Sequence, residues 1–448
     1  MELQTTYAAQ VYRDLCDRAP GEDEFLQAVR EVLLSIEGLV AADPRLEQNA
    51  ILERLVEPDR RIIFRITWQD DAGRVQVNRG YRFEFNNALG PYKGGLRFHA
   101  SVTPSIIKFL GFEQIFKNAL TGLWMGGAKG GSDFDPHGRS EAEVMRFCQA
   151  YMSELYRHLG PDIDVPAGDL GVGGREVGFM FGQYKRLTTR FTGVFTGKGP
   201  VFGGSLVRTE ATGYGLCYYT QDILAELLGD SFEGKTVVVS GSGNVALFAA
   251  EKAQAMGAKV VTLSDSGGYV HDPDGIDLAL AKQIKLVRRG RIAEYVDARP
   301  GATYVPGKRV WEVPCDIALP CATQDEIGVA DAQRLIDHGV KVVAEGANMP
   351  TTLEAIDAFR AAKVVFGPAK AANAGGVAVS GLEMSQDSQH LPWTFEEVDA
   401  KLRTIMATIV AVSLGAAREH GFGNDLLHGA NIASFQRVSG AMLAQGLY

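Results

Sequence analysis

Residues 236–246 read Thr-Val-Val-Val-Ser-Gly-Ser-Gly-Asn-Val-Ala. The β-branched run 236–239 is typical of a buried strand, and the turn that follows has the spacing G-x-G-x-x-A. In such a turn, Gly241 permits the tight bend, Gly243 lets the backbone approach a pyrophosphate, and the small final alanine lets a helix pack on the strand. A helix predicted over 245–256 would direct its first amides toward the phosphates. The stretch therefore predicts a dinucleotide-binding unit.

The sequence after residue 200 repeats this alternation of strand and helix. Helical segments separate several short apolar runs, which lie at 259–263, 315–319, 340–344 and 363–366. Buried parallel strands with crossover helices produce this pattern. We therefore predict an α/β chain in which residues 201–424 form a Rossmann-like, doubly wound dinucleotide-binding domain.

The sequence around the next strand end bears on the choice of cofactor. That strand ends at Ser264-Asp265, which places Asp265 24 residues after Gly241, near the position where an acid binds the ribose of NAD. A group of cations follows: Lys285, Arg288, Arg289 and Arg291. The 2′-phosphate of NADP would favour such cations, although a solvated helix face explains them equally well. The residue types alone leave NAD and NADP open.

The first 200 residues have a different pattern and carry no nucleotide fingerprint. Their N-terminal part has helical spacing, and two β-type runs then alternate around a hairpin signal at 70–73. Further helices are predicted over 101–119 and 141–158. We therefore predict that residues 1–200 form a second domain of mixed sheet and helices, and that C-terminal helices at 425–448 pack back on it.

Glycine is unusually frequent, with 52 of 448 residues, or 11.6%, against about 7% in an average protein. Part of the surplus brackets two lysines, Lys93 in Gly-Pro-Tyr-Lys-Gly-Gly-Leu-Arg and Lys129 in Gly-Gly-Ala-Lys-Gly-Gly. Another glycine-rich segment carries Asp169 in Pro-Ala-Gly-Asp-Leu-Gly-Val-Gly-Gly. Glycine pairs disfavour a helix around these lysines, so we predict loops that allow close backbone approach and place one amine each.

These lysines could form part of a substrate pocket if the fold brings them close to one another. Lys117 shares a helix face with Gln114, three residues before it, and could join Lys93 and Lys129 in a pocket for a substrate with two carboxylates. Mutual repulsion and partial burial would lower the pKa of a lysine there, which would make it a usable base. A single lysine in a glycine-rich loop usually belongs to an ordinary surface turn, but several such segments within about 85 residues favour a substrate-binding site.

Composition argues against several classes of function. The formal charge of −9 and the pI near 5.5 disfavour nucleic-acid binding. No apolar run reaches the ~18 residues that a membrane span needs, and the start of the chain lacks the features of a signal peptide. The five dispersed cysteines suggest no disulfide framework, and no histidine or cysteine pair has metal-ligand spacing. We expect a cytoplasmic protein without a metal, a membrane contact or a nucleic-acid partner.

The motifs together resemble the hexameric, small-subunit glutamate dehydrogenases of NADP type, within the Glu/Leu/Phe/Val dehydrogenase superfamily. The resemblance extends from about residue 50 to the C-terminus. The matching segments are 90–99, 126–131, 166–173, 208–213, 345–350 and 373–380. It implies reversible oxidative deamination of L-glutamate to 2-oxoglutarate and ammonium with hydride transfer to NADP. It also implies a homo-oligomer, usually a hexamer, whose first domain binds the substrate and mediates assembly.

The resemblance implies a substrate site with two ends. Lys93 and Ser380 would hold the distal carboxylate of the substrate. Gln114, Lys117 and the backbone at Gly168 would hold the α-carboxylate end.

It also implies roles in the reaction and in cofactor binding. Lys129 would activate water and polarise the carbonyl, and Asp169 would move protons to and from the substrate nitrogen. The residues implied in cofactor binding are Thr212, Gly241, Gly243, Asn244, Ser264, Asp265, Lys285 and Asn348. Among them, Ser264 and Lys285 would meet the 2′-phosphate, whereas Asp265 leaves dual use of NADP and NAD open. Residues 321–323 would line the nicotinamide side.

Two other functions stay open. A branched-chain or aromatic amino-acid dehydrogenase would share the glycine-flanked lysine and the aspartate but would need an apolar side-chain pocket. Lys93 and Ser380 disfavour it, because burying an amine without a carboxylate partner is costly. A non-catalytic nucleotide-binding protein on the same fold would be expected to lack Lys129 or Asp169, and both are present.

Overall fold

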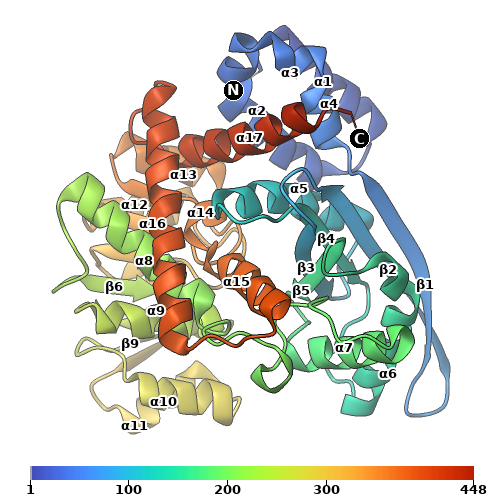
Figure 1. Cartoon of the computed structure of the whole chain (residues 1–448). Coiled ribbons are helices and arrows are strands. Elements are labelled where there is room, and N and C mark those ends of the chain that lie inside the picture. Colours follow the sequence, from blue (N-terminus) through green and yellow to red (C-terminus); the bar gives the residue numbers. More distant parts are fainter. Residues whose placement is uncertain (1–2, 448) are drawn as a thin grey trace. The chain divides into compact units, whose positions relative to one another are not determined.

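In the computed structural model, which describes residues 3–447, the run at 236–239 forms strand β6 (Thr236–Val239) within a five-stranded sheet. Figure 1 labels β6. The strand order of the sheet is β13-β12-β11-β6-β7, and every adjacent pair is parallel. The other strands are β7 (Lys259–Val260), β11 (Ile317–Leu319), β12 (Val342–Ala344) and β13 (Val365–Gly367). The predicted parallel α/β sheet is therefore confirmed.

Helices connect these strands, and a second sheet lies beside them. The helices are α8 (Ala211–Leu228), α9 (Asn244–Ala255), α10 (Leu278–Lys282), α11 (Tyr295–Ala298), α12 (Val329–Asp337), α13 (Leu353–Ala361) and α14 (Ala369–Ala372). The second sheet is antiparallel and consists of β8 (Thr262–Asp265), β9 (Gly268–His271) and β10 (Thr303–Pro306). The apolar runs do not predict this sheet, because the single run at 259–263 is divided between β7 and β8.

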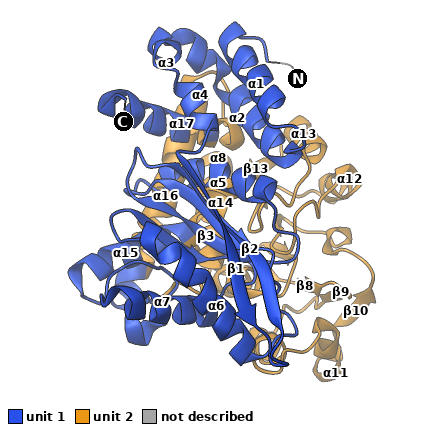
Figure 2. Ribbon diagram, turned by 90° about the vertical axis from the view of Figure 1, so that its right-hand side faces the viewer, with its two compact units in different colours: residues 1–206, 377–398, 431–448 blue, residues 207–376, 399–430 orange. Residues whose placement is uncertain are grey.

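The chain forms two compact units, coloured separately in Figure 2. Unit 1 comprises residues 1–206, 377–398 and 431–448, and unit 2 comprises residues 207–376 and 399–430. The boundaries predicted from the sequence place 377–398 in the dinucleotide-binding domain, and the structure corrects them. The segment belongs to unit 1 because its polar side chains bond there; for example, Gln386 Nε2 donates to Ser205 Oγ at 2.8 Å.

Unit 1 is built on a mixed five-stranded sheet in the order β1-β2-β4-β3-β5. The strands are β1 (Arg60–Gln69), β2 (Val75–Asn86), β3 (Tyr92–Phe98), β4 (Gly127–Ser132) and β5 (Asp164–Gly168). β1, β2 and β4 pair antiparallel, whereas β4, β3 and β5 pair parallel. The predicted hairpin and the predicted mixed sheet are both present.

The glycine segments around Lys93 and Lys129 are strands, so the predicted loops are wrong. Lys93 lies in β3 and Lys129 lies in β4, between β2 and β3. A Cβ on Gly94 would lie 1.7 Å from the carbonyl oxygen of Ala128, and a Cβ on Gly130 would lie 2.7 Å from that of Tyr81. Glycine is needed here for close packing of backbone against backbone, and not for a turn.

Unit 1 also contains the helices α1 (Thr6–Arg18), α2 (Asp23–Ala42), α3 (Pro44–Gln48), α4 (Ile51–Val56), α5 (Pro104–Leu120), α6 (Glu141–Leu155) and α7 (Gly174–Thr188). Of these, α5, α6 and α7 pack on the sheet. α6 and α7 share an aromatic-rich core with β1 and β3, in which Phe98, Phe147 and Tyr151 are buried. α6 begins at a capping box between Ser140 and Glu143, which fixes its first turn.

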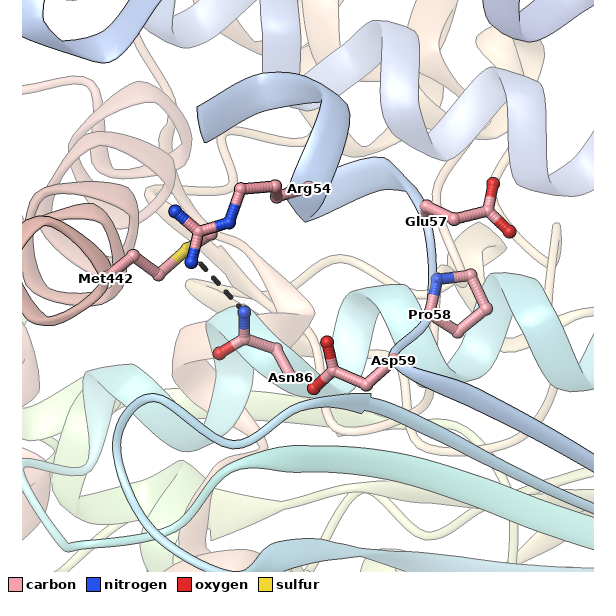
Figure 3. Close-up of a pocket in the computed structure, with 6 residues that line it drawn as sticks. All are labelled: Arg54, Glu57, Pro58, Asp59, Asn86 and Met442. Carbon is pink, nitrogen blue, oxygen red and sulfur yellow. Dashed lines mark hydrogen bonds between the residues drawn. The ribbon is translucent and has the colours of Figure 1, made fainter. Parts of the chain in front are cut away.

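The C-terminal helix α17 (Leu426–Gln445) bonds to unit 1 beyond residue 430. Arg437 donates to the carbonyl oxygens of Ala119 and Gly122, each at 2.6 Å. A cavity of about 240 Å³ lies beside this helix (Figure 3), lined by Arg54, Glu57, Pro58, Asp59, Asn86 and Met442. The described residues that we predicted for the site lie outside this lining. At its edge Asn86 Nδ2 donates to Met442 Sδ at 3.5 Å, which links β2 to the C-terminal helix.

Helices α15 (Gly375–Gln389) and α16 (Phe395–Glu419) precede α17. Among the described residues, α16 alone is long and apolar enough to cross a membrane, with a mean hydropathy of 1.4 over its most apolar window. Core helices satisfy the same criterion. Asp399 on α16 accepts a hydrogen bond from Tyr218 Oη at 2.6 Å and lies 3.6 Å from Lys252 Nζ, so α16 is bonded to α8 and α9 within unit 2.

We predict that Gly94→Ala strongly destabilises unit 1. Its methyl group would have to displace the backbone at Ala128, which should cost about 1–3 kcal/mol or more of unfolding free energy. Chemical denaturation would measure the change. Gly38→Ala on α2 is the matched control, because a Cβ there meets nothing within 4 Å and should be neutral or slightly stabilising. Equal stability of the two variants would contradict the close-packing explanation.

Candidate functional site

The centre of the candidate site in unit 1 is a lysine–aspartate pair. Lys129 Nζ lies 2.9 Å from Asp169 Oδ2, and Arg97 Nε donates to the same oxygen at 3.1 Å. The side chain of Lys129 is 8% exposed and that of Asp169 is 19% exposed. β4 supplies the lysine, β3 supplies the arginine, and the aspartate directly follows β5. Three adjacent parallel strands therefore bring these charges together.

The ionisable side chains of Lys129, Asp169 and Arg97 shift the pKa values of the lysine and the aspartate. Burial lowers the pKa of Lys129, the Asp169 carboxylate partly opposes this, and the positive charge of Arg97 lowers the pKa further. Burial would raise the pKa of Asp169, but the charges of Lys129 and Arg97 outweigh it and hold that pKa well below its usual range. The pair thus combines an amine that loses its proton more readily than usual with a carboxylate that stays ionised.

The residues predicted to hold the α-carboxylate of the substrate, Gln114 and Gly168, both lie against β3. A Cβ on Gly95 would lie 2.7 Å from the carbonyl oxygen of Gly168 and 3.0 Å from Asp169 Cβ, so β3 passes directly along this strand end. A Cβ on Gly94 would lie 3.3 Å from Gln114 Cγ on α5. Gln114 Nε2 in turn donates to Asn118 Oδ1 at 2.7 Å, which orients the amide. Gln114 and Gly168 therefore lie on either side of the same strand.

The remaining predicted substrate residues also belong to unit 1. Lys93 is 1% exposed on β3, and Asn118 on α5 donates to its carbonyl oxygen at 3.0 Å. Lys117 lies on the predicted helix, three residues after Gln114. Ser380 is 1% exposed on α15, and its neighbour Gly381 is packed so closely on Leu123 that a Cβ would lie 2.5 Å from that side chain. Unit 1 therefore contains every residue that the resemblance assigns to the substrate.

Arg82, to which the sequence pattern assigns no role, is completely buried beneath this group. Arg82 Nε donates to Asp164 Oδ2 at 2.7 Å, Nη2 donates to the other oxygen, and Nη1 donates to the carbonyl oxygen of Gly94 at 3.0 Å. Its charge also contributes to the lowered pKa of Lys129. The sequence pattern likewise assigns no role to Arg97, and its place directly after Gly-Gly-Leu in β3 is the one signal that could have drawn attention to it.

Unit 2 carries the dinucleotide turn in the predicted place. Gly241 follows β6 with φ at +84°, a conformation that favours glycine, and α9 begins at Asn244 with Gly243 as its N-cap. Gly243 has no side chain to cap the first amides of α9, and a Cβ on it would meet nothing within 4 Å. A pyrophosphate therefore has open space at this helix terminus, where the first backbone amides are suited to donate to it.

Other loops converge on this turn at the carboxyl ends of the parallel strands. A Cβ on Gly241 would lie 3.0 Å from the carbonyl oxygen of Cys321, after β11. A Cβ on Gly346, after β12, would lie 2.5 Å from Cys321 Sγ and 3.1 Å from Val245 Cγ1. These contacts place the predicted 321–323 segment beside the turn, where nucleotides bind in open parallel sheets.

A buried carboxylate that sequence reasoning missed holds this segment in place. Ser240 Oγ donates to Glu326 Oε1 at 2.9 Å, and the amide of Ala322 donates to the same oxygen at 3.0 Å. The amide of Cys321 donates to Ser240 Oγ at 2.9 Å. Glu326 therefore links the dinucleotide turn to the predicted nicotinamide-side loop. The sequence gives no signal for it beyond a lone glutamate near that loop.

The region predicted to bind the ribose of the cofactor, called the ribose edge below, contains Asp265 and two nearby cations, Lys285 and Arg291. Asp265 Oδ1 accepts the amide of Gly267 and Oδ2 accepts the amide of Ile292, both at 2.9 Å, and Lys285 Nζ lies 3.7 Å from Oδ2. Burial opposes ionisation of Asp265, but these amides and the nearby cations lower its pKa. Arg291 Nη1 donates to Ser266 Oγ at 2.8 Å. The cations therefore lie beside the acid.

The other predicted cofactor residues are also in unit 2. Ser264 Oγ accepts the amide of Gly241 at 2.7 Å, which joins the ribose edge to the turn. Thr212 lies in the first turn of α8, where a Cβ on Gly376 would come within 2.7 Å of its hydroxyl. Asn348 Oδ1 accepts Asn373 Nδ2 at 3.0 Å. Ser264 is thus hydrogen-bonded directly to the turn. Thr212 is positioned by α8, and Asn348 is positioned by the side-chain amide of Asn373.

A dinucleotide turn in one unit and a buried lysine–aspartate pair in the other are features of a dinucleotide-dependent enzyme. Comparison with known families gives the class more closely. Residues 203–446 match the Glutamate/Leucine/Phenylalanine/Valine dehydrogenase family, and residues 58–186 match the Glu/Leu/Phe/Val dehydrogenase dimerisation domain. The chain belongs to the Glu/Leu/Phe/Val dehydrogenase family.

Individual relatives are similar over almost their whole length. The chain is 62% identical over 431 residues to the NADP-specific glutamate dehydrogenase of Haemophilus influenzae, and the match covers 95% of this chain and 96% of the relative. It is 58% identical over 444 residues to the NAD(P)-specific glutamate dehydrogenase of Xylanibacter ruminicola, covering 98% and 100%. The crystal structure of Plasmodium falciparum glutamate dehydrogenase matches with a TM-score of 0.97 at 50% identity, covering 99% of this chain and 95% of that one.

We predict opposite effects of the two neighbours on the ionisation of Lys129. Asp169→Asn removes a charge that stabilises the ammonium and should lower the pKa of Lys129, whereas Arg97→Gln removes a repulsive charge and should raise it. Labelling of Lys129 with an amine-directed reagent over a pH series, quantified by peptide mass spectrometry, would measure both shifts. A shift in the same direction for both variants would contradict this electrostatic account.

Proposed function

We propose that the chain catalyses the reversible oxidative deamination of L-glutamate to 2-oxoglutarate and ammonium, with NADP as its preferred cofactor. The observation that carries the proposal is the buried contact between Lys129 Nζ and Asp169 Oδ2, in a chain of this family. An amine with a lowered pKa can act as a base toward water, and an adjacent carboxylate can relay protons. Relatives of 62% and 58% identity bear the name glutamate dehydrogenase.

The residues of the chain account for the water and proton steps of this reaction. When bound, NADP supplies the acceptor for the hydride from the substrate Cα. Neutral Lys129 then takes a proton from the water that attacks the resulting imine carbon. Asp169, 2.9 Å from the amine, relays this proton to the substrate nitrogen of the carbinolamine. Lys129, neutral again, then takes the proton of the carbinolamine hydroxyl as the C–N bond breaks, so that ammonia and 2-oxoglutarate are released. The lowered pKa of Lys129 favours the neutral amine that the water step needs.

The side-chain end of the site favours a dicarboxylate over an apolar amino acid. Lys93 places an amine inside unit 1, and Ser380 places a buried hydroxyl there. Both groups can donate hydrogen bonds to a distal carboxylate, and donation to a charged group is worth about 1.5–3 kcal/mol each. A branched-chain or aromatic side chain offers no acceptor to either group, which disfavours that alternative.

The ribose edge supports NADP as the preferred cofactor and NAD as a second one. Both carboxylate oxygens of Asp265 already accept backbone amides, and Lys285 lies beside them. Arg291 adds a second cation next to Ser266. These cations suit a 2′-phosphate, whereas Asp265 retains lone pairs that could accept a ribose hydroxyl. The names of the relatives include both NADP-specific and NAD(P)-specific enzymes.

The assembly that we propose is a homo-oligomer, with a hexamer as its preferred form. The segment 58–186 matches a domain described as a dimerisation domain. Within it, β1 is an edge strand, and Ile63, Val75 and Val77 on the β1–β2 hairpin are 57–68% exposed. Such an apolar edge is unusual for a surface that stays uncovered. A hetero-hexameric glutamate dehydrogenase from Thermus thermophilus has a similar structure at 27% identity.

The direct test is the absorbance of reduced cofactor in the presence of 2-oxoglutarate and ammonium. We expect NADPH to be consumed only when both substrates are present, and NADH to be consumed more slowly. Equal rates with both cofactors would overturn the preference for NADP. If neither NADPH nor NADH were consumed, the enzymatic proposal would be wrong, and the alternative of a nucleotide-binding protein without this activity would be favoured.

A double variant tests the side-chain end separately. We expect Lys93→Leu with Ser380→Val to lower kcat/KM for glutamate by about 100-fold or more, because two donors to the distal carboxylate are lost. Binding of NADPH, measured by fluorescence, should stay unchanged, because its predicted residues lie in unit 2. Oxidation of leucine, assayed in parallel, gives the matched substrate control. Unchanged glutamate turnover would show that these residues do not hold the distal carboxylate.

A further inference from the structure

A buried ion cluster in unit 1 has no role in the reaction as described so far. Lys198 Nζ lies 3.0 Å from Glu383 Oε1 and 2.8 Å from Asp387 Oδ2, and it also donates to the carbonyl oxygen of Phe195. The side chains of Lys198 and Glu383 are fully buried, and that of Asp387 is 8% exposed. A buried ammonium is costly unless its three protons are bonded, and three acceptors surround this one. The cluster therefore fixes its members in one arrangement.

Glu383 also binds the backbone of a strap, defined here as residues 194–199. The amide of Gly197 donates to Glu383 Oε2 at 3.0 Å, and the amide of Lys198 donates to Oε1 at 3.3 Å. Gly197 has φ at +81°, a conformation that favours glycine and bends the strap at this point. One carboxylate therefore organises an ammonium and two consecutive backbone amides.

The strap is bonded on its other edge to the strand that leads to Asp169. The amide of Thr196 donates to the carbonyl oxygen of Pro166 in β5 at 3.0 Å. A Cβ on Gly197 would lie 4.0 Å from the amide nitrogen of Gly168, so the strap passes in van der Waals contact with the end of β5. The bonds of the strap thus join Glu383 on α15 to the strand end directly before Asp169.

Ser380 lies on α15 one turn before Glu383. Residues three apart share a helix face, and both side chains are buried. A helix transmits a displacement of one turn to the next, because consecutive turns are joined by backbone hydrogen bonds. A shift of Glu383 relative to the strap would therefore move Ser380 relative to the end of β5.

We propose that Glu383 is a positioning residue, an inference that rests on the proposed function. Through the strap, it couples the helix that carries Ser380 to the strand end that carries Asp169. It thereby sets the spacing between the distal-carboxylate end and the proton-transferring end of the substrate site. Asp387 contacts the same ammonium but accepts neither strap amide in the described bonds, which makes it the matched control.

The kinetic test compares Glu383→Gln with Asp387→Asn. We expect Glu383→Gln to raise KM for 2-oxoglutarate by about tenfold, because the glutamine amide cannot accept both strap amides as the carboxylate does. KM for NADPH should change less than about twofold in the same variant. Asp387→Asn should change neither constant beyond that limit. An unchanged KM for 2-oxoglutarate in Glu383→Gln would overturn the proposal, as would an equal increase in Asp387→Asn.

A second variant separates positioning from stability. Glu383→Gln leaves an ammonium with one carboxylate fewer, so it should lower the melting temperature. Adding Lys198→Met removes this charge, and Asp387, whose pKa burial raises to about 6, can then take up a proton. We expect the melting temperature to recover while KM for 2-oxoglutarate stays raised. If KM recovered together with the melting temperature, the role of Glu383 would be structural only, and the proposal would be wrong.

Hydrogen exchange tests the coupling without any substrate. In Glu383→Gln we expect faster exchange in the strap, at residues 168–170 and in the Ser380 turn, with α6 unchanged as an internal reference. Faster exchange confined to the strap would overturn the proposal. A wild-type chain inactive toward 2-oxoglutarate would instead refute the proposed function, and the exchange pattern would still decide whether Glu383 couples the two elements.

Discussion

The close approach of β3, β4 and β5 is the constraint on which unit 1 depends. A Cβ on Gly94 would collide with the carbonyl oxygen of Ala128 in β4, and a Cβ on Gly95 would collide with that of Gly168 in β5, so the three strands can pack this way only with glycine at these positions of β3. Lysines that flank such glycines are held on a sheet and not on a mobile loop. The sheet therefore fixes the position of Lys129 before any ligand is bound, and preorganised charges of this kind need little rearrangement during a reaction.

The same packing determines the electrostatics of the site. Strands that approach closely exclude water, and burial is the largest cause of the lowered pKa of Lys129. Arg97 adds repulsion, and Arg82 adds more from beneath, where Asp164 compensates its charge and its guanidinium donates to a carbonyl oxygen of β3. Asp169 opposes these effects and keeps the amine within 2.9 Å. The acid–base properties of the pair thus follow from the glycine content of the sheet.

Features that depend on local sequence could be predicted, and features that depend on distant partners could not. The dinucleotide turn, the parallel strands and the helix that carries Gln114 and Lys117 all follow from local patterns, and the structure contains them. The glycine segments are wrongly predicted as loops because the low strand propensity of glycine is an average, whereas their strands are decided by contact with Ala128 and similar neighbours. The sequence places 377–398 in the wrong unit because the decisive ion pair of that segment joins residues 185 positions apart.

Asp265 shows why a motif residue does not by itself report the cofactor. By local rules, an acid at this distance from the first glycine favours the ribose hydroxyl of NAD. Here its two oxygens accept the amides of Gly267 and Ile292, so the carboxylate joins the strand end to the loop that carries Arg291. Lys285 lies 3.7 Å from the same carboxylate. An acid engaged in this way helps to hold cations at the ribose edge, and its presence is therefore compatible with a 2′-phosphate.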